Sequence, residues 1–198
     1  MIKVSSPPPG PAWEHAPTRE NVRGRARRLR VWLAVTVAVA VAVVPVCVLL
    51  GLPALIFLAE LLLMLLALPL EVSALVALRR TERVLRTYGW EAFPASFEVL
   101  TGDRTGQRVK IEFARGQTVP FNGGLLTRSP EARSRRAHPE LVWFAGDRRL
   151  GGVTSPVSGG CPVLIYRQRR AKGKAARGTA EADTLAWEAG LDRAPRSN

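Results

Sequence analysis

From Val31 to Leu78 nearly every residue of the chain is apolar. The hydrocarbon core of a membrane is about 30 Å thick and is spanned by roughly 20 helical residues. One straight helix over residues 31–78 would be roughly 70 Å long, so the run must fold back on itself. Gly51-Leu52-Pro53 supplies the break, because glycine permits a turn and proline does not continue a helix. The run therefore predicts two membrane helices, at residues 31–50 and 54–78.

Two other interpretations of this run are excluded. A cleaved signal peptide has a shorter apolar region that is followed by a cleavage site and polar sequence. Here a second apolar stretch follows at once. Val and Ala alternate over residues 37–44 with the period of a β-strand, but a lone strand cannot satisfy its backbone hydrogen bonds in lipid. We therefore expect a membrane α-helical hairpin.

Arginines flank the apolar run on both sides, whereas the loop between the predicted helices has no charge. By the positive-inside rule, both termini are expected to be cytoplasmic. Arginines at such positions are typical contacts of anionic lipid headgroups. The residues predicted to make this contact are Arg23, Arg25, Arg27, Arg28, Arg30, Arg79, Arg80 and Arg83.

Polar segments lie on both sides of the predicted hairpin. Residues 1–30 include a Ser- and Pro-rich stretch at positions 5–11 and are expected to form a disordered basic tail. Residues 79–88 are expected to extend the second helix into water as a juxtamembrane helix that stops at Gly89. Residues 168–198 are expected to form a basic, mostly disordered tail with a short helix at 180–189.

The segment 89–167 shows the period of β-strands. Val109, Ile111 and Phe113 alternate with Lys110 and Glu112, which is typical of a half-buried strand. Further short apolar stretches at 97–99, 141–144, 151–154 and 162–166 are separated by Gly-containing turns. About five such strands predict a small all-β, barrel-like cytoplasmic domain.

The chain resembles uncharacterised small actinobacterial two-helix integral membrane proteins. The resemblance rests on the basic tail, the two apolar helices, and the segments Trp-Phe-Ala-Gly-Asp-Arg-Arg-Leu-Gly-Gly-Val (143–153) and Pro-Val-Leu-Ile (162–165). It covers most of the chain and implies no activity and no site residues. Arg also outnumbers Lys by 25 to 4, which is typical of GC-rich bacterial coding. The expected location is the bacterial cytoplasmic membrane, crossed more than once.

No sequence motif for catalysis, cofactor binding or metal binding is present. Gly173-Lys174 lacks the upstream Gly and the following Ser or Thr of a phosphate-binding loop. His15 and His138 have no metal-ligand neighbours and are expected to be solvated surface residues. Cys161 lies in a Gly-Gly-Cys-Pro turn, and it is a candidate nucleophile only if His138 lies beside it. We therefore expect no enzyme activity, no cofactor and no metal site.

Nucleic-acid binding is a further alternative, carried by aromatic residues of the β-domain. Tyr88, Trp90, Phe93 and Trp143 are able to stack on bases if they are exposed. They fall at strand positions where packing in the core explains them equally well. The basic residues lie mainly beside the apolar helices, which favours lipid over nucleic acid as their partner.

Glu60 and Glu71 are the ionisable residues within the predicted hairpin. Glu60 lies about seven residues past the turn, roughly 10 Å down the helix. We expect it to be a neutral hydrogen-bond donor to an acceptor that Pro45 leaves free on the other helix. Small residues at Ala34, Ala38 and Ala42 are a candidate face for close helix contact.

Three functions follow from these features. The leading hypothesis is a non-enzymatic membrane-tethered adaptor or accessory subunit that binds a protein partner through its cytoplasmic β-domain. The alternative is a homo-oligomeric transport or conduction element that uses Glu60 and Glu71. A remote alternative is an enzyme that uses Cys161.

Overall fold

A computed structural model describes residues 6–49, 51, 54–99, 107–114, 116–123, 141–167 and 178–191 of the 198-residue chain. The chain divides into two compact units, which are described separately. One is a helical unit, Arg23–Leu78, and the other is a barrel unit that combines Met1–Val22 with Arg79–Asn198. Helices α1 (Ala16–Leu49) and α2 (Ala54–Thr87), each of 34 residues, contribute to both units.

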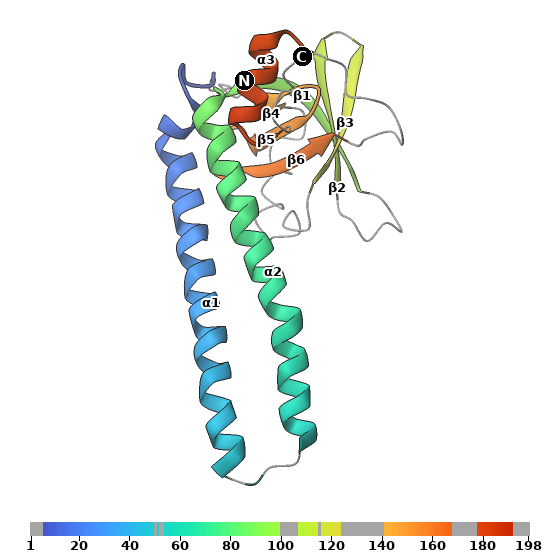
Figure 1. Cartoon of the computed structure of the whole chain (residues 1–198). Helices are drawn as coiled ribbons and strands as arrows, with labels where there is room; N and C mark the ends of the chain where they lie inside the picture. The colour runs from blue at the N-terminus through green and yellow to red at the C-terminus, as the bar shows by residue number, and fades with distance from the viewer. Residues whose placement is uncertain are drawn as a thin grey trace. The chain divides into compact units, whose positions relative to one another are not determined.

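In the helical unit the chain reverses at Gly51, between α1 and α2 (Figure 1). Gly51 has a φ of +58°, a left-handed conformation that glycine adopts without steric penalty. Side chains of low exposure recur every three or four residues, the spacing of one helix face. On α1 they are Leu33, Thr36, Ala40 and Val43, and on α2 they include Glu71, Ala74 and Leu78.

Both predicted helices are present, but each is longer at its polar end. The helical extension predicted for residues 79–88 is present up to Thr87, where α2 ends. The disordered tail predicted over residues 1–30 is wrong for residues 16–30, which form the first half of α1. Pro17 lies in the first turn, where its missing N–H is not needed. Thr18 and Val22 are buried against the barrel, so tertiary contacts order a segment whose composition suggested disorder.

The prediction that Ala34, Ala38 and Ala42 form the face of close helix contact is also wrong. All three are exposed, whereas Ala40 is buried. The reason is the position of the polar pair Thr36 and Glu71, which selects the α1 face that carries Thr36 and Ala40.

The barrel unit contains a closed, all-antiparallel barrel in the strand order β1-β2-β3-β6-β5-β4 (Figure 1). The predicted all-β barrel is therefore confirmed, with one strand more than expected in the described part of the chain. The strands are β1 (Glu91–Val99), β2 (Gln107–Ala114), β3 (Gln117–Gly123), β4 (Leu141–Asp147), β5 (Gly151–Pro156) and β6 (Val163–Arg167).

Strand β3 is the one that the sequence pattern missed, because it is polar and contains Pro120. A proline removes one hydrogen-bond donor from a sheet. β3 pairs with β6 only at Phe121–Gly123, so Pro120 lies where the second neighbour has not yet begun. Pro94 occupies a similar point in β1, where pairing passes from β4 to β2.

The barrel interior and its outer face form two separate apolar cores. Inside, Phe93, Phe121 and Phe144 pack edge-on against Phe113, and Phe121 and Phe144 are tilted against each other. Aliphatic residues of β2, β4 and β6 complete this core. The outer core combines side chains of β4, β5 and β6 with residues near the start of α1, the end of α2 and the end of α3. Its members are Ala12, Val22, Val84, Leu85, Trp90, Trp143, Ala145, Val153, Leu164 and Ala189. β4 alternates between the two cores, which explains why it is buried on both faces.

The predicted short helix of the C-terminal tail is confirmed as α3 (Ala180–Glu188). Thr179 caps its N-terminus, since its hydroxyl accepts a hydrogen bond from the amide of Ala182 at 3.3 Å. Ala186 and Ala189 are fully buried. The prediction of a mostly disordered tail is therefore wrong for residues 178–191, because α3 is ordered there and Ala189 is part of the outer core.

Candidate functional site

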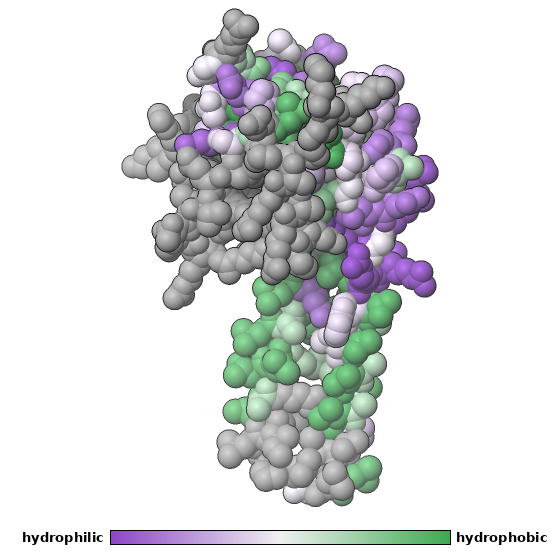
Figure 2. Space-filling view, turned by 180° about the vertical axis from the view of Figure 1, so that it is seen from behind, coloured by the Kyte–Doolittle hydropathy of each residue, from purple (hydrophilic) through white to green (hydrophobic). Residues whose placement is uncertain are grey.

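Large apolar side chains are exposed over the described surface of α1 and α2 (Figure 2). Soluble monomers rarely expose contiguous apolar patches of more than a few hundred Å². One helical stretch among the described residues, Leu62–Thr87, is long and apolar enough to cross a membrane, with a mean hydropathy of 2.0. The exposed residues are Val31, Trp32, Val35, Val37, Val39, Val41 and Leu49 on α1 and Leu58, Leu62, Leu63, Leu65, Leu66, Leu70, Val72 and Val76 on α2.

The arginines predicted to contact lipid lie on helices. Arg23, Arg27 and Arg30 recur at spacings of four and three, so they share one face of α1, and all three are exposed. Arg79, Arg80 and Arg83 are exposed near the C-terminal end of α2. The remaining two, Arg25 and Arg28, lie on α1 between Arg23 and Arg30. Arg25 is half-buried and Arg28 is exposed.

Arg86, one turn after Arg83, has partners within the barrel unit. It forms an ion pair of 2.6 Å with Glu82 on the same helix. Its guanidinium also lies 5.3 Å from the ring centre of Trp13, within the range of a cation–π contact. Arg86 therefore ties the end of α2 to the segment that precedes α1.

A polar pair joins the helices within the apolar surface. The hydroxyl of Thr36 donates a hydrogen bond of 2.9 Å to Oε1 of Glu71. Oε2 of Glu71 is buried and has no hydrogen-bond partner among the described residues. Position 60 lies on α2 eleven residues before Glu71, about three helical turns away and thus on the same helix face. The predicted contacts of the Glu60 side chain fall outside the described structure.

A second polar cluster anchors the start of α1 to the barrel. Thr18 is fully buried, and its hydroxyl donates to the carbonyl of Gly159 at 3.0 Å. Because that hydroxyl has one proton, its contacts with Trp90 Nε1 (3.3 Å) and His15 Nδ1 (3.0 Å) must be donated by those rings. His15 also meets Trp143 edge-on, at 5.4 Å between ring centres. The expectation of a solvated His15 in a disordered tail is therefore wrong.

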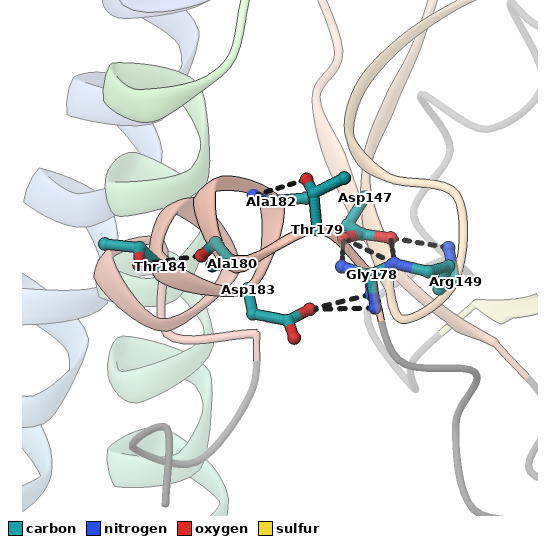
Figure 3. Close-up of polar contacts among 8 residues, drawn as sticks. All are labelled: Asp147, Arg149, Gly178, Thr179, Ala180, Ala182, Asp183 and Thr184. Atoms are coloured by element: carbon teal, nitrogen blue, oxygen red, sulfur yellow. Dashed lines mark hydrogen bonds and ion pairs between the residues drawn. The ribbon is translucent and has the colours of Figure 1, made fainter. Parts of the chain in front are cut away.

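A third cluster holds α3 against the β4–β5 turn (Figure 3). The guanidinium of Arg149 bonds to both carboxylate oxygens of Asp147, with contacts of 2.6 and 3.1 Å, and to Asp183 of α3 at 2.7 Å. Hydrogen bonds to Asp147 raise the pKa of Arg149 further above its ordinary range, against the opposing effect of burial. Nearby, burial and then the charge of Asp147 raise the pKa of Tyr88 to about 12.

The other candidate residues lie apart from these clusters. Cys161 is buried in the turn between β5 and β6, and its amide donates to Ser155 Oγ at 3.2 Å. The pairing of Cys161 with His138 cannot be placed, since His138 lies outside the described residues. Three of the aromatic residues considered for base stacking are buried core residues: Trp90, Phe93 and Trp143.

Within the described ranges no group of three or more His, Cys, Asp or Glu side chains is arranged to hold a metal ion. Comparisons with protein families, curated proteins and solved structures find no match to this chain.

The sequence interpretation missed Thr36, Thr18 and Arg149. Thr36 had a usable signal, because it is the only hydroxyl residue between Val31 and Leu50 and the opposite helix carries a carboxylate. Thr18 lay in a stretch that composition assigned to disorder. Arg149 is one arginine among many, and no local pattern links it to Asp183, which lies 34 residues away.

Proposed function

We propose that the protein is an integral membrane protein of the bacterial cytoplasmic membrane, in which the α1–α2 hairpin crosses the bilayer twice and both termini are cytoplasmic. The barrel then acts at the membrane surface as a non-enzymatic adaptor or accessory subunit that binds another protein. The exposed apolar side chains on both helices carry the membrane part of this proposal.

Several observations support two spans. The exposed apolar side chains of α1 begin at Val31 and Trp32, directly after the last arginine of its polar half. Tryptophan is favoured at the membrane–water interface, so Trp32 marks that boundary. In the span on α2 only 11% of the apolar window is buried, unlike the core helix of a soluble protein. The Thr36–Glu71 hydrogen bond lets the helices bury their polar groups against one another.

The orientation is tested with topology reporters on the full chain. A reporter that is active only outside the cytoplasm is expected to be silent when fused after Asn198 and active when inserted beside Gly51. A cytoplasmic reporter at the same two positions should give the reverse pattern. Extraction of the untagged chain from membranes by alkaline carbonate would contradict integral insertion altogether.

The packed interior of the barrel supports an adaptor role. The ring of phenylalanines around Phe113 fills the inside, so recognition is left to the outer surface and its loops. Isolation of the native complex from membranes, followed by identification of proteins that co-purify in stoichiometric amounts, tests this role. A chain that purifies alone from gently solubilised membranes, at native expression level, would contradict it.

Oligomeric conduction or transport is the second candidate, and it is favoured by Oε2 of Glu71, which has no hydrogen-bond partner in the described part of the chain. A buried carboxylate oxygen without a partner is unusual, and intramembrane acids are often part of ion or proton paths. Proteoliposomes that contain the purified chain separate the candidates. Flux that Glu71→Gln abolishes, with assembly retained, supports conduction; equal flux with empty liposomes supports the adaptor.

A further inference from the structure

Helix α3 is attached to the barrel unit by its smallest side chains. Ala186 and Ala189 are fully buried, whereas Leu185 and Trp187 are 36% and 48% exposed. A helix that forms a permanent part of a core normally buries its large apolar residues. α3 does the opposite, so its docking depends on close backbone approach and on polar contacts.

The polar contact of α3 is the ion pair between Arg149 of the β4–β5 turn and Asp183, and Arg149 is also held by a residue of the barrel. Arg149 is held by Asp147, whose side chain is only 8% exposed, through its Nε and Nη2 atoms. Its Nη1 atom donates a hydrogen bond of 2.7 Å to Asp183 of α3 (Figure 3). Asp183 also accepts from the amide of Gly178 at 3.3 Å, which shapes the start of the helix. Asp147 therefore fixes the position of the Arg149 guanidinium that receives the Asp183 carboxylate.

Close approach sets the second requirement on the docked helix. A Cβ added to Gly178 would collide with the guanidinium of Arg149. At the other end, a Cβ on Gly190 would make an ordinary van der Waals contact, 3.9 Å from Arg83 Nη1 on α2, so the close approach is at Gly178. The surface under α3 spans the β4–β5 turn and the C-terminal end of α2, and it buries two small residues three positions apart, Ala186 and Ala189.

We propose that this surface is an exchangeable helix-binding site, that α3 is its resident occupant, and that a partner protein binds by replacing α3. The partner is a short amphipathic helix with an acidic residue followed by small residues three and six positions later, as in Asp183, Ala186 and Ala189. Its use by a physiological partner rests on the adaptor function proposed above. The exchange itself is a property of the barrel unit and can be measured without that partner.

The first experiment uses the chain truncated after Arg177, purified in detergent, and a fluorescein-labelled peptide of residues 178–191. Saturable binding is expected by fluorescence anisotropy. Binding to the full chain should be at least about tenfold weaker, because the tethered α3 competes at high effective concentration. Equal binding to both chains, or no binding to a folded truncated chain, would overturn the proposal.

Matched peptides test the mode of binding. Asp183→Asn should weaken binding about five- to tenfold, since it removes one charge-assisted contact. Ala186→Glu places a carboxylate on the buried face and should abolish binding. Leu185→Glu adds the same charge on the exposed face and should change affinity by no more than about twofold. If both Glu variants behave alike, the peptide does not dock as α3 does.

A second variant covers the case in which the truncated chain does not fold. A protease site inserted between Arg167 and Gly178 allows α3 to be cut free after the full chain has folded. The cleaved fragment is expected to exchange with excess labelled peptide, while the remaining chain keeps its cooperative thermal transition. A fragment that stays bound and does not exchange would show that α3 is a fixed part of the fold, and the proposal would then be wrong.

Discussion

Thr36 and Glu71 form a hydrogen bond of 2.9 Å across the two helices of the hairpin, although 35 positions separate them in the sequence. The contact gives each helix a defined rotation, because it places the face with Ala40 against the face with Ala74. In an apolar environment a lost interhelical hydrogen bond leaves a polar group without solvent to replace its partner.

The first prediction concerns this pair. Thr36→Val keeps the shape of the side chain and removes the donor, so neither oxygen of Glu71 would then have a hydrogen-bond partner among the residues that the structure describes. We expect the hairpin to lose about 0.6 to 1.7 kcal/mol of helix association free energy. Glu71→Gln should be nearly neutral, because the amide oxygen still accepts from Thr36. Detergent titration followed by energy transfer between dyes on α1 and α2 measures the change.

Glu60 provides a comparison on the same helix face. The sequence predicts that Glu60→Gln preserves assembly, whereas Glu60→Leu loosens the hairpin or changes its oligomeric state. If Glu60→Leu and Thr36→Val weaken association independently, their effects should add. An unchanged hairpin in the Thr36→Val variant would show that the hydrogen bond does not stabilise the helix pair.

The second prediction concerns Gly159, which has a φ of +70°. A Cβ at this position would come within 2.6 Å of Thr18 Oγ1 and 2.7 Å of His15 Nδ1. Gly159→Ala therefore combines backbone strain of about 1 to 2 kcal/mol with displacement of the Thr18 cluster. We expect a fall of at least 2 kcal/mol in the free energy of unfolding of the barrel unit, by analogy with other strained core substitutions. Chemical denaturation followed by tryptophan fluorescence measures it.

Thr18 variants separate the hydrogen bonds from the strain. Thr18→Val leaves the carbonyl of Gly159 and the N–H of Trp90 unpaired, at a cost of about 1 to 3 kcal/mol. Thr18→Ser keeps the hydroxyl and removes one methyl group, worth about 0.8 kcal/mol. Should the two variants be equally stable, the hydroxyl would have no structural role.

The helices of the hairpin, strand β2 and helix α3 are predictable from the sequence, because the local spacing of apolar residues determines their secondary structure. The apolar run predicted both helices of the hairpin, and the alternation at Val109, Ile111 and Phe113 predicted β2. The short helix of the tail was found from composition alone. In these segments the period of apolar residues and the secondary structure agree.

The errors come from contacts that local pattern does not encode. Residues 16–30 are polar and were assigned to disorder, yet the burial of Thr18 and Val22 against β-strands far along the chain makes them helical. β3 was missed because Pro120 is tolerated only where no second strand pairs. The Arg149–Asp183 pair depends on the closure of the barrel, and no spacing rule predicts it.

The third prediction concerns the titration of Tyr88. Its pKa is raised by burial to about 12, above the ordinary value of 10.0, so the folded state favours the neutral phenol. Its contribution to stability is therefore complete below pH 10 and is lost as pH rises toward 12. In a Tyr166→Phe variant, Tyr88 is the remaining tyrosine of the chain, and the ultraviolet absorbance of tyrosinate reports its ionisation. A midpoint near 10 in the folded protein would contradict the burial argument.

The fourth prediction concerns the smallest chain that forms the barrel unit. A fragment of residues 88–170 contains all the strands that the structure describes, β1 to β6, and strand pattern alone predicts that it folds. The structure predicts otherwise, because Trp143, Val153 and Leu164 on the outer face of the barrel are covered by residues that this fragment lacks. A tryptophan buries about 150 to 250 Å², so its exposure favours aggregation.

Residues 6–22 joined to residues 79–191 by a Gly/Ser linker of about ten residues restore this cover without the apolar helices. We expect this chain to be soluble and monomeric in gel filtration, with a cooperative thermal transition. The matched control is residues 79–191 alone, which lacks Ala12, Thr18 and Val22 and leaves Trp90 Nε1 without its acceptor. The control should aggregate or melt without cooperativity. If the control and residues 88–170 fold as stably as the linked chain, the N-terminal segment is not part of the barrel unit, and the Thr18 cluster has no role in holding it together.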